Sequence, residues 1–149
     1  MTPERDQLAQ DRIVVGVDGS DESKAALRWA ADLAKALDCV IDVVCVWEFP
    51  VVTTWEGSYA VTLPDYDPET VALETAERVV ADVFGDDRPR ELSIATKLGS
   101  PGGALVEASA EATMLVVGSR GLGGIKGMLL GSVSRICAEH AKCPVLVVH

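Results

Sequence analysis

MLVVGSRGLGGIKGMLLGSVS, residues 114–134, is the stretch that indicates both the fold class and the candidate site. It opens with an apolar run, continues as a glycine-rich segment, and passes at Gly131-Ser132 into an amphipathic run that ends at Lys142. This order predicts a buried strand, a loop and a helix. Glycine lets the backbone come close to a ligand, and the first turn of a helix offers unpaired N–H groups and a partial positive charge. Such a loop suits a bound phosphate group.

The glycines of this loop have a defined spacing: Gly118 is followed by two residues and Gly121, and then by nine residues and Gly131-Ser132. The Walker motif requires Ser or Thr directly after its lysine, whereas Lys126 precedes a glycine. The dinucleotide pattern Gly-x-Gly-x-x-Gly does not fit the loop either. The alternative is a flexible connector, but such connectors are rare between a buried strand and a helix in an α/β chain.

Composition restricts the class of protein and of ligand. A chain of 149 residues that is 48% hydrophobic has the size and the core of one ordinary domain. No apolar stretch approaches the roughly 20 residues that span a bilayer, and the first residues lack the apolar run of a signal peptide. We therefore expect a cytoplasmic protein without a membrane partner.

The net charge of the chain limits the kind of partner that it can bind. The formal net charge of −10 argues against a nucleic-acid partner, because phosphate backbones select basic surfaces. A small anionic ligand then needs a local positive site, which Arg120, Lys126 and the helix N-terminus can supply. In the alternative interpretation both side chains are simply solvated charges.

The cysteines, Cys39, Cys45, Cys137 and Cys143, have no metal-like spacing and lie in apolar contexts. We interpret them as reduced packing residues in a reducing compartment, with redox sensing as the alternative. No metal site is predicted.

Strand-like and helix-like segments alternate along the chain. Residues 1–12 are polar and expected to form a flexible tail, and residues 13–149 a single domain. The predicted strands are 13–17, 40–46, 91–98, 114–117 and 145–148, and the predicted helices begin near Ser20, Asp67, Ser100 and Ser132. The third helix is expected to reach Ala112 and the fourth Lys142. This alternation predicts an α/β fold with one open parallel sheet and helices on both faces.

Ligands of such folds bind beyond the carboxyl ends of the strands, where the strand order reverses. The turn at Asp18 and the loop at Gly118 follow the two best-buried strands. If these strands are neighbours, the two segments face one another across one crevice. Asp18 is either a ligand contact or a simple turn former.

The connection from Trp47 to Asp67 is unusually long for a compact domain. It contains Pro50, Gly57 and Pro64 together with several aromatic residues, which favour partial packing over disorder. Two interpretations stay open: the segment covers a ligand, or it covers a hydrophobic edge.

Three segments together carry a resemblance: VVGVDGSDES at 14–23, GSRGLGGIKGMLLGSVS at 118–134 and CPVLVVH at 143–149. They resemble the universal stress protein family, over residues 13–149. The glycine spacing matches the signature of the family's ATP-binding branch. The resemblance implies a Rossmann-like adenine-nucleotide-binding fold with a five-stranded parallel sheet of order 3-2-1-4-5. It also implies a homodimer through the final strand, Val145 to Val148.

The resemblance further implies a set of binding residues for ATP, possibly with Mg²⁺. Gly16 and Asp18 would meet the adenine or ribose end, and Val44 would pack on the adenine, although Val44 also suits the core. The backbone of the loop would wrap the phosphates and ribose, namely Gly118, Ser119, Arg120, Gly121, Leu122, Gly123 and Gly124. The helix N-terminus would close the phosphate site with Gly131, Ser132, Val133 and Ser134.

The loop patterns and the resemblance together predict an ATP-binding regulatory or sensor protein rather than an enzyme, and the resemblance implies that it acts in the stress response. Phosphoryl transfer needs a positioned metal and groups that stabilise the developing charge, and no catalytic residue is predicted here. At most very slow ATP hydrolysis is expected. Two alternatives remain: a nucleotide-free dimeric interaction module, and an ATP-using enzyme of a related adenine-binding α/β fold.

Overall fold

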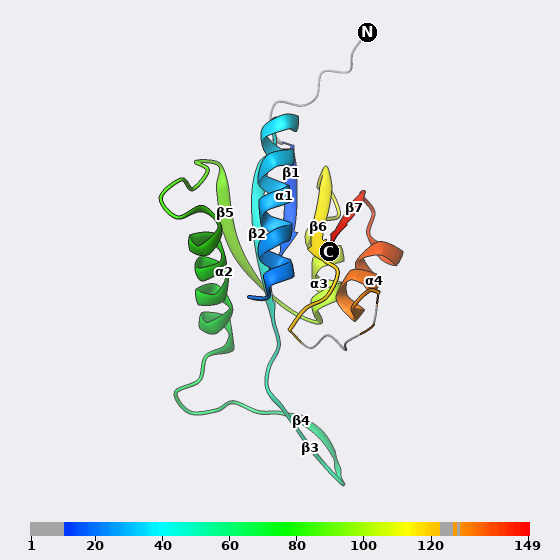
Figure 1. Ribbon diagram of the computed structural model, residues 1–149. Coiled ribbons are helices and arrows are strands. Elements are labelled where there is room, and N and C mark those ends of the chain that lie inside the picture. Colours follow the sequence, from blue (N-terminus) through cyan, green and yellow to red (C-terminus); the bar gives the residue numbers. More distant parts are fainter. Residues whose placement is uncertain (1–10, 123–126, 128) are drawn as a thin grey trace.

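The computed structural model describes residues 11–122, 127 and 129–149. Five parallel strands form one sheet: β1 (Arg12–Gly16), β2 (Val40–Trp47), β5 (Leu92–Leu98), β6 (Met114–Gly118) and β7 (Val145–Val148). Their order across the sheet is β5-β2-β1-β6-β7. In order of appearance within this sheet that is 3-2-1-4-5, so the predicted α/β class and strand order are confirmed (Figure 1).

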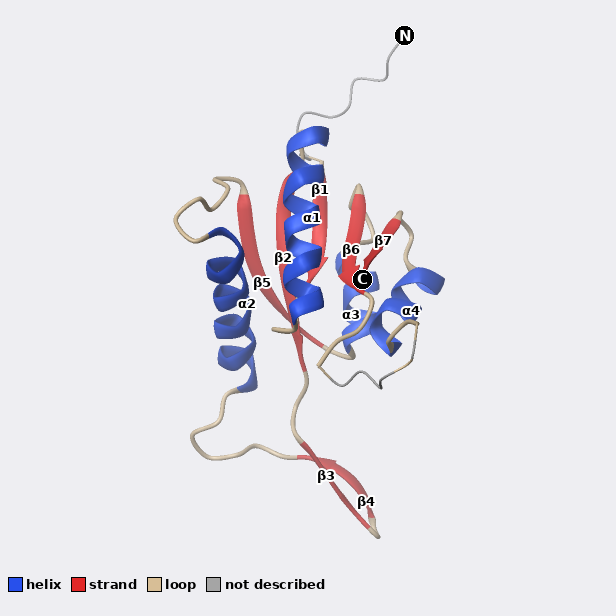
Figure 2. Ribbon diagram, in the orientation of Figure 1, coloured by secondary structure: helices blue, strands red, loops and turns tan. Residues whose placement is uncertain are grey.

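Four helices cover the two faces of the sheet: α1 (Asp21–Leu37), α2 (Pro68–Phe84), α3 (Pro101–Ala108) and α4 (Ser132–His140). Figure 2 shows α1 in front of the sheet and α3 behind it. Alternate residues of β1 face opposite layers. Ile13 and Val15 pack with Leu27 of α1 and Val79 of α2, whereas Val14 belongs to a second cluster that contains residues of α3 and α4. The central strand is therefore buried on both faces, as its uninterrupted apolar run predicts.

Element boundaries differ from the sequence expectation by a few residues. β1 begins at Arg12, the last residue of the expected tail, and residues 1–10 lie outside the described part. α3 ends at Ala108 instead of Ala112, because the N–H groups of Ala110 and Ala112 donate to the carbonyls of Glu107 and Ser109, three residues back, and so form turns in place of a further helical ladder. α4 ends at His140, since Ala141 is extended.

The long connection after β2 contains two strands that the sequence analysis did not predict. β3 (Val51–Thr54) and β4 (Gly57–Ala60) pair antiparallel, with Val51 opposite Ala60 and Thr54 opposite Gly57. Every residue of both strands is exposed. Figure 1 shows this hairpin projecting away from the five-stranded sheet, at the bottom of the view.

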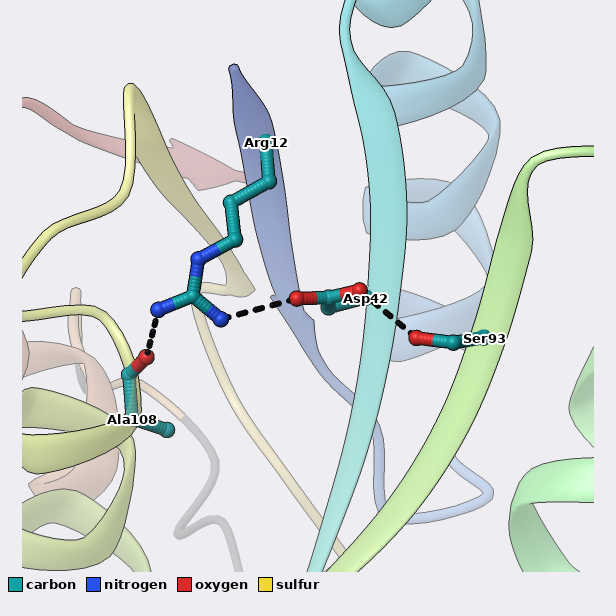
Figure 3. A network of polar contacts seen from close by, with 4 residues as sticks. All are labelled: Arg12, Asp42, Ser93 and Ala108. Atoms are coloured by element: carbon teal, nitrogen blue, oxygen red, sulfur yellow. Dashed lines mark hydrogen bonds and ion pairs between the residues drawn. The ribbon is translucent and has the colours of Figure 1, made fainter. Parts of the chain in front are cut away.

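A polar network fastens the amino ends of the central strands (Figure 3). Arg12 Nη1 lies 2.8 Å from Asp42 Oδ2, and Arg12 Nη2 donates to the carbonyl of Ala108 at 3.1 Å. Ser93 Oγ donates to Asp42 Oδ1 at 2.6 Å. One arginine and one carboxylate thus connect β1, β2, β5 and α3, which explains why Asp42 interrupts an otherwise apolar strand. The network thus lies at the end of the sheet opposite to the carboxyl ends of the strands, where the candidate site lies.

Candidate functional site

The candidate site lies where β1 and β6 end side by side. β1 is central, and it pairs with β2 on one side and with β6 on the other. The chain leaves β1 toward β2 and later returns on the opposite side as β6, so the strand order reverses at this point. Ligands of open α/β sheets bind at such positions.

A cavity of about 440 Å³ opens at this point. Its volume falls within the roughly 300–1,000 Å³ of small-molecule sites. The described residues of the sequence-predicted site all line it: Gly16, Asp18, Val44, Gly118, Ser119, Arg120, Gly121, Leu122, Gly131, Ser132, Val133 and Ser134. Gly123, Gly124 and Lys126 lie outside the described residues. The predicted crevice between the β1 turn and the β6 loop therefore exists.

Seven further residues line the cavity and were not predicted: Val17, Ser20, Ser23, Val46, Pro101, Leu105 and Val117. Val46 lies two residues after Val44 on β2, so strand periodicity could have found it. Pro101 and Leu105 belong to α3, and no motif indicates that this helix reaches the site.

The carboxylate of Asp18 joins the two loops. Its Oδ1 accepts hydrogen bonds from the backbone N–H of Ser20 at 2.9 Å and from Ser20 Oγ at 2.5 Å. Its Oδ2 accepts from the backbone N–H of Leu122 at 3.1 Å. Ser20 Oγ also accepts from the N–H of Ser23 and so caps α1. Asp18 is therefore both a turn former and a lining residue of the cavity.

Two glycines of the β6 loop are required by close approach rather than by a left-handed backbone. A Cβ at Gly121 would collide with Asp18 Oδ2. A Cβ at Gly118 would lie 2.8 Å from the Cβ of Glu22 and 2.9 Å from its backbone carbonyl carbon. These contacts give a steric reason for the first two positions of the glycine spacing.

The far end of the loop is fixed to its start. The N–H of Gly131 donates to the carbonyl of Ser119 at 2.7 Å, and Ser134 Oγ donates to the same carbonyl at 3.0 Å. Gly131 is the N-cap of α4 but has no side chain that could accept from the first turn. The first turn of α4 thus lines the cavity with Ser132, Val133 and Ser134, and a helix N-terminus at a cavity suits an anion.

The walls of the cavity differ in character. Val44 and Val46 of β2 and Leu105 of α3 form an apolar part, while Asp18 and the first turn of α4 supply polar groups. Gly16 contributes through packing, because a Cβ there would lie 2.6 Å from Cδ1 of Leu105. A ligand with an apolar ring and an anionic group fits these two parts.

The charge near the loop is partly balanced. Arg120 Nη2 lies 3.9 Å from Glu22 Oε1, and the arginine side chain is 42% exposed.

Burial, followed by the charge of Asp18, raises the pKa of the Cys45 thiol to about 11. Cys45 therefore stays a neutral thiol behind the site at neutral pH.

Neither a metal cluster nor a membrane helix is found in the described part of the chain. No group of three or more His, Cys, Asp or Glu side chains there is placed to hold a metal ion. Among the same residues, no helix combines the length and apolarity needed to traverse a lipid bilayer.

Comparisons with known proteins agree with this geometry. The model of the universal stress protein family matches residues 10–149. A universal stress protein of Mycolicibacterium smegmatis is 41% identical over 140 residues, which are 92% of this chain and 47% of that protein. The universal stress protein YxiE of Bacillus subtilis is 30% identical over 93% of this chain and 98% of its own length. The chain thus spans about half the length of the mycobacterial relative and nearly all of the Bacillus protein.

A solved structure described as a universal stress protein in complex with cAMP aligns with a TM-score of 0.66 at 28% identity. The alignment covers 95% of this chain and 98% of the solved one. The fold, the family match over residues 10–149 and these relatives lead to one conclusion: the chain belongs to the universal stress protein family.

Proposed function

We propose that this chain binds an adenine nucleotide, with ATP as the expected ligand, in the cavity between the β1 turn and the β6 loop. In this proposal it serves as a regulatory or sensor protein of the stress response. One observation carries the proposal: a cavity of about 440 Å³ combines an apolar wall with a helix N-terminus and a glycine loop. The related structure that contains cAMP supports an adenine nucleotide as the ligand class.

The two parts of the cavity suggest an orientation for the nucleotide. The adenine would pack between Val44 and Leu105, which line the apolar part. The phosphates would lie at Ser132 and Ser134, where the first turn of α4 offers N–H donors. Gly118 and Gly121 let the backbone of the β6 loop lie close to Glu22 and Asp18 where it lines the cavity.

A divalent ion would depend mainly on the nucleotide. Mg²⁺ is commonly held by one or two carboxylates together with phosphate oxygens and waters. Asp18 is the carboxylate that lines the cavity among the described residues. It can therefore supply one oxygen ligand while the phosphates supply others.

Retention of the nucleotide fits the site better than rapid turnover. Phosphoryl transfer depends on cationic groups and a metal placed around the transferred phosphate. Among the described lining residues the cationic side chain is Arg120, and it lies near Glu22. We therefore propose at most very slow hydrolysis.

We also propose that two copies pair through β7 in the cytoplasm. β7 is an edge strand of four residues, VLVV, that hydrogen-bonds to β6 on one side. An apolar edge strand invites pairing with another chain. The free cysteines, three of them buried, suit a reducing compartment.

The test is denaturing extraction of purified protein followed by chromatography of released nucleotide, with ATP titration by calorimetry. A Gly118→Glu, Gly121→Glu variant adds bulk and negative charge at two lining positions, but its new Cβ atoms would meet Glu22 and Asp18. Ser132→Glu, at the exposed start of α4, is therefore a second variant that adds the charge without these collisions, and Ala36→Glu, on the exposed side of α1, is the matched control. Nucleotide with wild type and Ala36→Glu, but not with folded Ser132→Glu or with the folded double variant, supports the proposal. No released nucleotide and no calorimetric signal with magnesium would leave the interaction module as the better function.

A further inference from the structure

The segment between β2 and α2 carries an exposed hydrophobic arm, residues 51–60, formed by β3, β4 and their turn. Trp55 in the turn is 93% exposed, and Val51, Val52 and Tyr59 are 60%, 48% and 51% exposed. Figure 1 shows the arm standing away from the sheet. An indole and three further large apolar side chains therefore lie open to water in this chain on its own.

The arm contains little that stabilises it internally. Its side-chain hydrogen bonds, such as the 3.0 Å contact between Thr53 Oγ1 and Ser58 Oγ, are exposed. A two-stranded hairpin alone is marginally stable in water and needs a surface to pack against. An ordered arm with eight exposed strand residues thus calls for a covering partner.

A pocket lies at the base of the same arm. It has a volume of about 290 Å³ and is lined by Trp47, Phe49, Pro50, Val61, Thr62, Leu63, Tyr66, Asp67 and Pro68. The rings of Trp47 and Phe49 meet edge to face, with centroids 5.2 Å apart. Because the lining is largely apolar and aromatic, an aromatic side chain is a suitable occupant of this pocket.

Trp55 cannot fill the pocket of its own chain. The pocket begins at Pro50 and Val61, which are joined by the hydrogen bond from Val61 N to Pro50 O at 2.9 Å. Trp55 follows four extended residues of β3, and four strand residues span about 13 Å. The pairing of β3 with β4 keeps the arm extended, so Trp55 in the turn is separated from the base of its own arm by the length of the strands.

We propose that the arm is exchanged between two copies of this chain, with Trp55 of each copy entering the pocket at the base of the other copy's arm. Both complementary parts are present in one sequence, so a two-fold arrangement makes the same contact twice and closes. Buried aromatic anchors of this kind commonly dominate an interface.

The acidic residues of the segment make the proposed association depend on ionic strength. Glu56 lies next to Trp55, and Asp65 and Asp67 lie near the pocket, within a chain of net charge −10. Repulsion between copies opposes pairing at low ionic strength and is screened by salt. Arm exchange should therefore strengthen as salt is raised, whereas a basic partner protein would bind the arm more weakly at high salt.

The first test compares the mass in solution by sedimentation at micromolar concentration. Trp55→Ala should raise the dissociation constant of assembly about tenfold or more, whether or not β7 also pairs. Trp29→Ala, which removes an indole that is 56% exposed on α1, is the matched control and should leave the dissociation constant unchanged. Equal dissociation constants for wild type and Trp55→Ala at both low and high salt would overturn the proposal.

A second test locates the contact and is independent of nucleotide binding and of pairing through β7. One chain carries Glu56→Cys at the arm tip, and a tagged chain of different mass carries Thr62→Cys in the pocket, both with Cys143→Ser. Oxidation of the mixture should give mainly the mixed disulfide. Absence of that product, or a predominance of like-with-like products, contradicts arm exchange even where the chains still form dimers.

Discussion

Asp18 Oδ2 accepts a hydrogen bond from the N–H of Leu122 at 3.1 Å, and 104 positions separate the two residues in the sequence. The same carboxylate holds Ser20 through Oδ1. One side chain therefore joins the turn after β1 to the loop after β6, on opposite sides of the point where strand order reverses. Any nucleotide in the cavity lies beside this link.

We expect Asp18→Asn to weaken ATP binding about tenfold, measured by calorimetry. The amide retains one acceptor for Ser20, but its NH₂ group then faces the N–H of Leu122, so two donors meet. Loss of the link should also speed hydrogen exchange at the Leu122 amide. Asp21→Asn on the exposed start of α1 is the control. Equal affinities for the two variants would show that Asp18 serves only the turn.

Gly121→Ala tests the close approach directly. The new methyl group collides with Asp18 Oδ2, and overpacking of this kind costs about 1–3 kcal/mol of unfolding free energy. We expect a lower urea midpoint together with loss of ATP affinity. Ala36→Ser is the control, since it adds one atom on the exposed side of α1, away from the cavity. Combining Gly121→Ala with Asp18→Ser, which shortens the side chain, should restore part of the stability.

Sequence reasoning predicted the five-stranded sheet because each strand there has a local signal. Val14 and Val15 lie in an apolar run that fits a doubly buried strand, and glycines or caps mark the ends. The strand order came from the family resemblance, since local patterns do not state which strands are neighbours. The structure confirms both the class and the order.

The arm and the α3 wall were missed for different reasons. Residues 51–60, VVTTWEGSYA, do not alternate between apolar and polar side chains, and the strand residues are all exposed, so the arm lacks the one-sided pattern of a strand packed on a core. Leu105 lies in the predicted third helix, but its position at the cavity follows from tertiary packing beside Gly16. Periodicity reports which side of an element is apolar and does not report what lies opposite.

Ser132→Glu should abolish most ATP binding while leaving the fold intact. Ser132 is exposed at the first position of α4, where a carboxylate interacts favourably with the helix dipole. The same charge would repel the phosphates, and we expect at least a tenfold loss of affinity by calorimetry. Ser132→Ala is the control for loss of the hydroxyl. Undiminished binding by the glutamate variant would place the phosphates elsewhere.

Arg12→Leu should destabilise the chain without changing nucleotide affinity. The substitution leaves the partly buried carboxylate of Asp42 without its 2.8 Å cationic partner and the Ala108 carbonyl without its donor. Loss of such bonds costs about 1–3 kcal/mol of unfolding free energy, measured in urea. Arg88→Leu removes an exposed pair with Glu77 and should change stability by less than about 1 kcal/mol. Reduced ATP affinity of folded Arg12→Leu would mean that the two ends of the sheet are coupled.

Two buried thiols should make the protein less stable in alkali. Burial raises the pKa of Cys45 and of Cys137 from 9.0 to about 11, and the charge of Asp18 adds to the effect at Cys45 as that of the ionised Cys143 thiol does at Cys137. Between pH 9 and 11 the unfolded thiols lose protons that the folded thiols keep, so unfolding becomes easier as pH rises. We expect the urea midpoint to fall over this window and to fall less in Cys45→Val, which lacks one ionisable group. Identical pH profiles for the two proteins would show that Cys45 ionises as easily in the folded chain as in the unfolded one.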